Sequence, residues 1–191
     1  SFKFRGTQLQ DLSFIPCSIS TLEIEDNWKH NGSLEQAYSL TRFTNLTSLS
    51  LPYNGLKSIP SQIFLLTNLT HLDLQGNNIN INSSSSSFTS FSNLKSFNLK
   101  QIYLGDLPTS FTSLAPHLTQ LFLSIQIDSP LSSNILQSLT NLTFLGIDHY
   151  FFMDKIDLEM IFEKWISNLT NLQTLCLWKL KSDMVIPNSI S

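Results

Sequence analysis

Residues 46–69 read LTSLSLPYNGLKSIPSQIFLLTNL and contain the spacing that decides the fold. Leu46, Leu49 and Leu51 are three and two residues apart, and Asn54 follows three residues later. The same spacing begins again at Leu69. The positions of the second copy are Leu69, Leu72, Leu74 and Asn77. An internal repeat of this length indicates a chain built from stacked structural units.

The leucine spacing predicts one short β-strand in each copy. Side chains alternate between the two faces of a strand, so Leu49 and Leu51 point to one face while Ser48 and Ser50 point to the other. A single strand cannot bury its leucines alone, whereas a neighbouring copy completes a parallel sheet with a continuous core. Asn54 follows the strand, where its amide can bond the backbone of the bend in its own and the adjacent copy.

One strand position extends this register along the whole chain. Its occupants are separated by 20, 27, 23, 25, 24, 24 and 30 residues, close to the lengths expected of single-strand repeats. They are Phe4, Ile24, Leu51, Leu74, Leu99, Leu123, Ile147 and Leu177. Eight registers in 191 residues leave no room for an independent second domain. We therefore expect residues 1–191 to form one solenoid segment of about eight repeats, the first and last partial and without capping modules.

The repeat resembles the leucine-rich-repeat family. The L-x-x-L-x-L-x-x-N-x-L spacing carries the resemblance, together with Leu-Thr-Asn-Leu at 66–69 and 139–142. The pairs Ile59-Pro60, Leu107-Pro108 and Ile186-Pro187 resemble the x-I-P variant of plant and amoeba receptor-like ectodomains. The resemblance implies an α/β leucine-rich-repeat solenoid, with about eight short parallel strands on its concave side. It also implies recognition of proteins or peptides on that side, without catalysis.

The later repeats depart from this pattern. The bend Asn is present at Asn27, Asn54 and Asn77, and after residue 100 other residue types replace it. Apolar residues at helical spacing predict short helices on the convex side over 34–38 and 157–166.

The outward strand positions change in character along the array. Phe122 and Phe144 fall on adjacent strands, Trp178 lies one strand further, and Gly146 is expected to leave a gap beside them. Exposed aromatic side chains on a sheet are common anchors of a protein interface. We interpret these three as candidate partner-binding residues; the alternative is that they pack beneath neighbouring loops.

Three polar residues on the same face are candidates for setting specificity. They are His71, Asp73 and Glu23. A metal site would need further ligands beside His71 and Asp73, and a hydrolytic triad would need a shielded nucleophile. The sequence provides neither, and no glycine-rich phosphate loop occurs among the six glycines. We therefore expect no catalytic residues, no metal and no cofactor.

Composition narrows the range of partners. Charged residues make up 13% of the chain, the net charge is −3 and no basic run occurs, which argues against a nucleic-acid surface. No apolar stretch reaches about 18 residues, so we expect no membrane span in this segment.

Two features point to different compartments. Cys17 and Cys176 lie too many repeats apart to form a bridge, and unpaired cysteines favour a reducing environment. Six N-x-S/T triplets favour N-glycosylation and an extracellular or cell-surface location. The glycosylation candidates are Asn31, Asn45, Asn68, Asn82, Asn141 and Asn168. Three of them precede the first leucine of a strand, and the alternative is that Asn-Leu-Thr simply suits the turn into the strand.

The sequence leaves three hypotheses for function. The first is a non-catalytic recognition module that binds a protein or peptide on its concave face, within a longer extracellular or cell-surface glycoprotein. The second is a structural glycoprotein that stacks end to end with further copies of itself, or with flanking repeats, into a fibre or coat. The third is a cytosolic scaffold.

Overall fold

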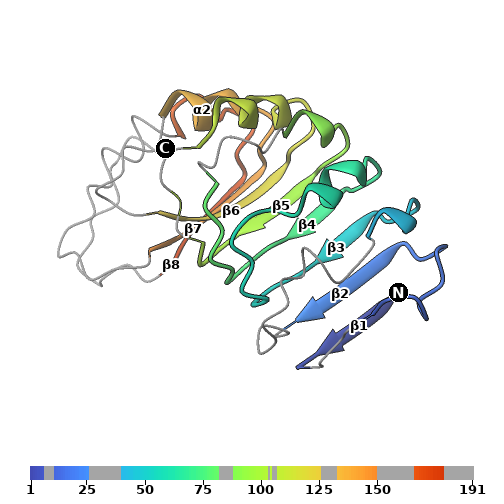
Figure 1. Cartoon of the computed structure of the whole chain (residues 1–191). Helices are drawn as coiled ribbons and strands as arrows, with labels where there is room; N and C mark the ends of the chain where they lie inside the picture. The colour runs from blue at the N-terminus through green and yellow to red at the C-terminus, as the bar shows by residue number, and fades with distance from the viewer. Residues whose placement is uncertain are drawn as a thin grey trace.

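The computed structural model describes residues 1–6, 11–25, 40–81, 88–102, 104, 107–125, 133–149 and 166–178. These residues form one sheet of eight strands that lie side by side in chain order (Figure 1). The strands are β1 (Phe2–Arg5), β2 (Thr21–Glu25), β3 (Ser48–Ser50), β4 (His71–Asp73), β5 (Ser96–Leu99), β6 (Gln120–Ile125), β7 (Phe144–His149) and β8 (Thr174–Trp178). Every neighbouring pair is parallel, which confirms the predicted fold class.

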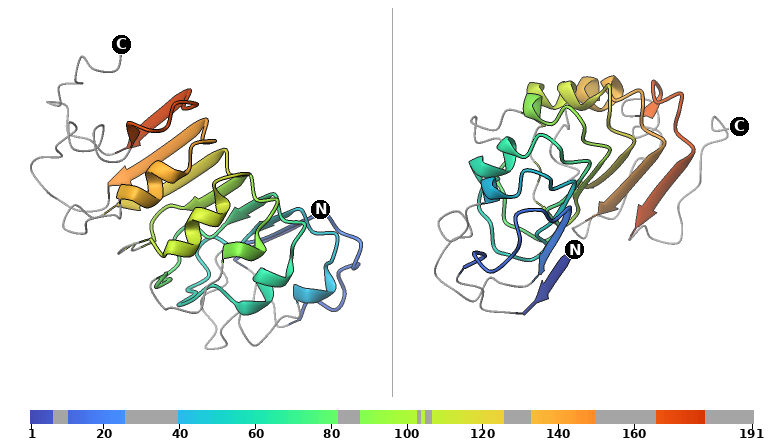
Figure 2. Two further views of the ribbon diagram at one scale, coloured as in Figure 1. Left: turned by 90° about the horizontal axis from the view of Figure 1, so that it is seen from above. Right: turned by 90° about the vertical axis from the view of Figure 1, so that its right-hand side faces the viewer.

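Among the described residues, a short helix lies in each of the five connections between β2 and β7. Four are 3-10 helices: η1 (Leu40–Arg42), η2 (Ser61–Leu65), η3 (Phe88–Ser90) and η4 (Thr109–Leu114). The fifth is the α-helix α2 (Ser133–Ser138). All five lie on one side of the sheet, as the two views of Figure 2 show. No described helix lies on the other side, which is here called the open face. The helical segment predicted at 34–38 falls outside the described residues, and so does the one predicted at 157–166 apart from Ile166.

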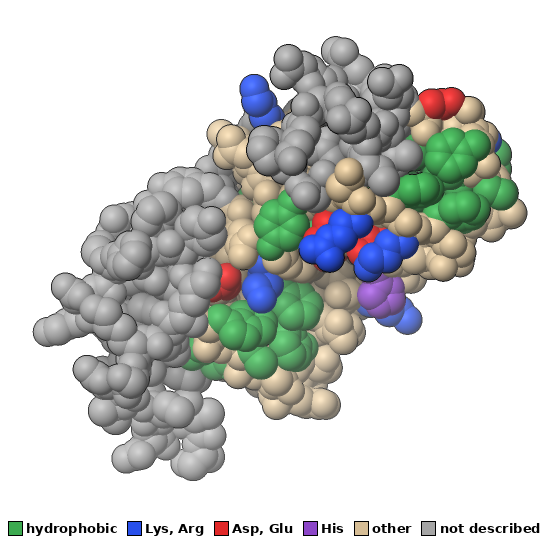
Figure 3. Space-filling model, turned by 90° about the horizontal axis from the view of Figure 1, so that it is seen from below, with side chains coloured by type: hydrophobic (Ala, Val, Ile, Leu, Met, Phe, Trp, Pro, Cys, Tyr) green, Lys and Arg blue, Asp and Glu red, His purple; other side chains and the backbone are tan. Residues whose placement is uncertain are grey.

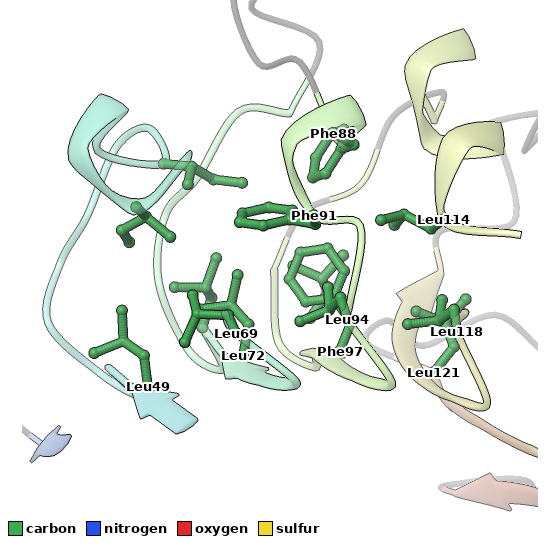
Figure 4. Close-up of a cluster of buried hydrophobic side chains, with 14 of the residues drawn as sticks. Leu49, Leu69, Leu72, Phe88, Phe91, Leu94, Phe97, Leu114, Leu118 and Leu121 are labelled. Atoms are coloured by element: carbon green, nitrogen blue, oxygen red, sulfur yellow. The ribbon is translucent and has the colours of Figure 1, made fainter. Parts of the chain in front are cut away.

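The core lies between the sheet and these helices. The first inward leucine of the repeat aligns across the sheet, with Leu49 beside Leu72 and Leu72 beside Phe97. These side chains, and Leu121 further along, are at most 1% exposed. Burial of each such side chain contributes about 1.5–3 kcal/mol relative to its exposure. Figure 4 shows the rows they form from repeat to repeat.

Phenylalanines thicken the core at its centre. Phe88 and Phe111 pack with ring centroids 5.0 Å apart, and Phe97 lies 5.9 Å from Phe111. Phe91 completes the group at 6.2 Å from Phe88 (Figure 4). Because these rings come from η3, η4 and β5, they connect the helical side directly to the sheet.

Two of the predicted x-Pro pairs have a visible structural role. Pro60 and Pro108 immediately precede η2 and η4, with φ angles of −54° and −67°. Their carbonyls accept the first hydrogen bonds of the two helices, from the N–H of Ile63 and of Phe111, each at 2.9 Å. Proline suits this position because its fixed φ matches a helix start, where its missing N–H leaves no bond unmade.

Buried asparagines hold the bends after β3 and β4. The Asn77 Oδ1 accepts hydrogen bonds from the backbone N–H of Asn54 and of Leu56, both at 3.0 Å. Its Nδ2 donates to the carbonyls of Leu51 at 2.8 Å and Leu74 at 2.7 Å. One side chain therefore joins two consecutive repeats, as the sequence predicted for this position. Asn27, the first member of the predicted series, lies outside the described residues.

The backbone bend itself follows a rule that the leucine spacing did not reveal. A positive φ, between 55° and 69°, recurs two residues after the second inward residue of a strand. The residues at this position are Gly6, Tyr53, Gly76 and Gln101. The bend therefore requires a left-handed residue there, which glycine adopts most readily. In β6 and β7, where Asn is absent from the bend, the strands instead run six residues each.

We predict that Asn77→Ala lowers the free energy of unfolding by at least about 3 kcal/mol, because it leaves two backbone N–H groups and two carbonyls without their buried partner. Urea denaturation measures this change. Asn78→Ala, at the exposed neighbouring position, is the control and should change stability by less than about 0.5 kcal/mol. Equal stabilities for the two variants would contradict the structural role of Asn77.

Candidate binding surface

The open face of the sheet, opposite the short helices, holds the candidate binding residues. Figure 3 views the molecule from this side and shows hydrophobic side chains gathered beside charged ones. All six candidates lie on strands at outward positions, from Glu23 on β2 to Trp178 on β8. The structure separates them into an aromatic group and a polar group.

Phe122, Phe144 and Trp178 form the aromatic group, here called the aromatic cluster. The rings of Phe122 and Phe144 have centroids 4.9 Å apart, and Phe122 stacks on Trp178 at 6.3 Å. All three side chains are partly exposed. Phe122 therefore contacts both of the other candidate anchors on the open face, although the three come from separate repeats.

The gap that the sequence predicted at Gly146 does not exist. A Cβ atom built at Gly146 would lie 2.6 Å from the outer ring carbons of Trp178 and 2.9 Å from the Phe122 ring. The Trp178 indole thus reaches across the neighbouring strand and fills the space that the missing side chain leaves. The glycine allows the two aromatic rings to meet directly above β7.

Lys100 joins this cluster, although sequence reasoning did not single it out. Its Nζ lies 3.7 Å from the centroid of the Trp178 ring, a close cation–π contact. Lys100 comes directly after β5, and the Trp178 indole leans from β8 across Gly146 to the Phe122 ring on β6, so the two side chains together span β6 and β7. The spacing pattern placed Lys100 on the open face but could not reveal this reach.

Two polar side chains are buried in the same part of the open face. Ser124 pairs in register with Asp148, and Asp148 pairs with Trp178. Ser124 and Asp148 are each only 3% exposed, although outward positions of a sheet usually meet solvent. The Ser124 hydroxyl accepts a hydrogen bond from the Gln101 N–H at 2.6 Å. This end of the face is therefore more enclosed than the rest.

The polar group occupies the other end of the face. Glu23 forms an ion pair with Lys3 at 2.6 Å, and on the same two strands Arg5 pairs with Glu25 at 3.4 Å. His71 is exposed, with its Nδ1 2.8 Å from the Thr70 hydroxyl. The charges of these two ion pairs balance one another.

Asp73 differs from its polar neighbours because it is mostly buried. Burial raises the pKa of its carboxyl above the ordinary value, and the nearby charges of Glu23 and Glu25 act in the same direction. Hydrogen bonds from the Gln75 backbone and the Asn98 side chain oppose this rise in pKa without cancelling it. The folded protein therefore disfavours the ionised form of Asp73 relative to the unfolded chain.

A second row of asparagines lies at the start of the strands. Each donates its side-chain amide to a backbone carbonyl of the preceding repeat. The bonds run from Asn68 to Thr44 (2.8 Å), Asn93 to Thr67 (3.1 Å), Asn141 to Ala115 (3.2 Å) and Asn171 to Thr140 (2.9 Å). Asn93 and Asn171 do not begin an N-x-S/T triplet, yet they make the same bond. Packing between repeats is therefore a sufficient reason for Asn at this position.

Part of this row borders a shallow groove of about 470 Å³. Its lining consists of Asn45, Thr47, Asn68, Thr70, Asn93 and Lys95. Thr47 and Thr70 also donate their hydroxyls to backbone carbonyls, those of Ser20 at 3.1 Å and of Thr47 at 2.9 Å. The groove is thus lined by side chains that already form the hydrogen bonds between consecutive repeats.

Among the described residues, no three His, Cys, Asp or Glu side chains gather closely enough to hold a metal ion. Within the same residues, no helix has the length and apolar character needed to cross a membrane. Cys17 and Cys176 are both free thiols. The Cys17 sulfur accepts hydrogen bonds from the Arg42 Nε and Nη2, each at 3.3 Å.

Comparisons with known proteins agree with this geometry. A family model described as leucine rich repeat matches residues 44–101, which span the clearest copies. Among solved structures, a leucine-rich-repeat protein of Leptospira interrogans superposes with a TM-score of 0.54 at 22% sequence identity. The alignment covers 82% of this chain and 36% of that protein, so the chain spans about a third of its length. No curated protein matches significantly.

The stacked single-strand repeats, with bend asparagines and a leucine core, define the class of a repeat solenoid. The chain has the fold of a leucine-rich-repeat solenoid, and its residues 44–101 match the leucine-rich-repeat family model. The x-I-P subtype stays a prediction.

We predict that Gly146→Ala displaces the Trp178 indole, because the new methyl group would occupy the space of its outer ring. The expected result is a shifted Trp178 indole N–H resonance and a loss of about 1–3 kcal/mol in the free energy of unfolding. The resonance is assigned by its absence in Trp178→Phe. Thr174→Ala, at an exposed position of β8, is the control. An unchanged indole resonance in Gly146→Ala would show that the rings do not meet there.

We predict that Asp73→Asn stabilises the protein at neutral pH. The pKa of Asp73 is raised in the folded state, so the folded chain holds this proton over a pH range in which the unfolded chain has released it. The contribution of Asp73 to the free energy of unfolding therefore falls as the pH rises above about 3.8. Asp73→Asn has no carboxyl to ionise and avoids this loss. Below this pH the two proteins should converge.

Thermal unfolding at a series of pH values measures the difference. Asp11→Asn is a control of opposite sign, since hydrogen bonds from the Ser13 hydroxyl and backbone N–H lower the pKa of Asp11. A wild-type protein more stable than Asp73→Asn at pH 7 would contradict the assigned burial of this carboxyl.

Proposed function

We propose that this segment is a non-catalytic recognition module that binds a protein or peptide partner on the open face of its sheet. The observation that carries the proposal is the aromatic cluster. Three large rings from separate repeats gather around Phe122, on a face whose other outward side chains are mainly polar. Clustered, partly exposed aromatic residues are typical centres of binding interfaces.

The surroundings of the cluster support this role. Contact between Trp178 and Phe122 across Gly146 holds both rings before any partner arrives, which reduces the entropy lost on binding. The leucine-rich-repeat architecture itself presents an extended sheet surface that such proteins use for binding. His71, Asp73 and Glu23 lie on the same face, where they would contact a partner long enough to extend beyond the cluster and would add polar specificity.

We predict that Phe122→Ala/Phe144→Ala weakens partner binding at least tenfold, because central aromatic anchors commonly contribute about 2 kcal/mol or more. A random 12-residue peptide library displayed on phage supplies the ligands, and fluorescence anisotropy measures the affinity of selected peptides. Gln120→Ala/Thr174→Ala is the matched control, since both residues are exposed on the same face. Peptides that bind the wild type and the aromatic double variant equally would remove the proposed site.

We also propose that the segment belongs to an extracellular or cell-surface glycoprotein. Asn45, Asn68, Asn141 and Asn168 all have exposed side chains, while Asn31 and Asn82 lie outside the described residues. The amides of Asn68 and Asn141 already bond the preceding repeat. No described residue accepts a hydrogen bond from the side-chain amide of Asn45. Among the three equivalent positions, this amide is therefore the most available for the attachment of a glycan.

We predict that protein secreted from eukaryotic cells carries a glycan at Asn45. Asn45→Gln should then lower the intact mass by one glycan beyond the change of side chain. Asn93→Gln is the matched control, because it has the equivalent position without the triplet and should lose no glycan. Identical masses before and after endoglycosidase treatment would contradict the proposed glycosylation.

A further inference from the structure

The ammonium group of Lys100 differs from the other cations of the open face. Lys3 and Arg5 are paired with Glu23 and Glu25. Among the described residues, no carboxylate lies within ion-pairing distance of Lys100, whose charge instead rests on the Trp178 ring. Within the part of the chain that the structure describes, Lys100 therefore presents a positive charge without an acidic partner, directly beside the aromatic cluster.

The contact with Trp178 also positions this charge. A lysine ammonium has three donors on a flexible stem, and the ring contact restricts where they point. Since a cation–π contact uses no hydrogen-bond acceptor, donors of Lys100 stay available to a ligand. Lys100 is partly exposed, so a ligand that lies on Phe122 and Phe144 can reach its ammonium.

We propose that the aromatic cluster and Lys100 together bind a peptide segment that presents a carboxylate next to an apolar side chain. This inference rests on the proposed function and adds the chemistry of the ligand. The apolar side chain packs on Phe122 and Phe144, and the carboxylate accepts hydrogen bonds from the Lys100 ammonium. The carboxylate belongs either to an Asp or Glu side chain or to the end of a chain, and both offer the same group to Lys100.

Charge complementarity disfavours the other ligand classes. A cationic ligand would meet the like charge of Lys100, which already occupies the Trp178 ring. A purely apolar ligand would cover the ammonium without supplying an acceptor, which carries a desolvation cost. Asp148 lies in register with Trp178 on this face, but its 3% exposure keeps it beneath the surface that a ligand would contact.

The test compares the peptides selected by the wild-type chain and by Lys100→Gln from two random 12-residue libraries. One library has blocked ends, and the other has a free carboxyl end, so the two distinguish a side-chain from a terminal carboxylate. We expect the wild type to enrich acidic groups next to aromatic or aliphatic residues, and Lys100→Gln to lose this acidic preference. Lys95→Gln, which removes an exposed lysine away from the cluster, should keep it.

A double-mutant cycle then measures the coupling free energy between Lys100 and the carboxylate of the ligand. It compares the affinities of the wild type and Lys100→Gln for one selected peptide and for its neutral amide counterpart. Lys100→Gln should lower the affinity for the acidic peptide at least tenfold and change the affinity for the neutral peptide less than twofold. Neutral or basic selected peptides that still require Phe122 and Phe144 would overturn this inference and leave the proposed function standing. Selection that is insensitive to Phe122→Ala/Phe144→Ala, or no enrichment from either library, would overturn both.

Discussion

Every feature of this protein depends on the stacking of inward aliphatic side chains in rows that run perpendicular to the strands. Leu49 lies beside Leu72, Leu72 beside Phe97 and Phe97 beside Leu121, all in one parallel register. A slip of one residue in any strand would turn its inward side chains to the open face. The apolar core therefore holds the register, and the register determines which side chains meet on the other side of the sheet.

The aromatic cluster is a consequence of this register. Phe122 lies beside Gly146, and Gly146 lies beside Cys176, so the three positions form one row on the open face. The small residue in the middle of the row allows Trp178 to lean back onto Phe122 from the next position along β8. The longer strands β6 and β7 widen the face at this point, whereas β3 and β4 are only three residues long. Departure from the repeat consensus and the appearance of aromatic side chains thus coincide in the same part of the chain.

Spacing alone predicted the parallel sheet, its order, the inward residues and the adjacency of Phe122 and Phe144. It succeeded because each of these properties depends on alternation and on the repeat length. It failed at Gly146, where an expected gap is filled, and it overlooked Lys100. Both depend on how far a long side chain reaches across neighbouring strands, which strand periodicity does not encode.

The asparagines show a different kind of limit. Asn77 was recognised from its place in the consensus, and its four strong hydrogen bonds explain that consensus physically. The sequence gives two interpretations of Asn68 and Asn141, as first residues of glycosylation triplets or as residues that suit the turn into the strand, and neither includes their bonds to the preceding repeat. Asn93 and Asn171 occupy the same position before a leucine without such a triplet, and that recurrence was the available signal.

The parallel, in-register stacking of the repeats is tested most directly by nuclear Overhauser effects between backbone protons of neighbouring strands. The structure predicts contacts that follow one parallel order, with Ser48 near His71, Leu49 near Leu72 and Ser50 near Asp73. Contacts of Ser48 with Asp73 and of Ser50 with His71 would show antiparallel pairing. That result would contradict both the fold and the binding surface built on it.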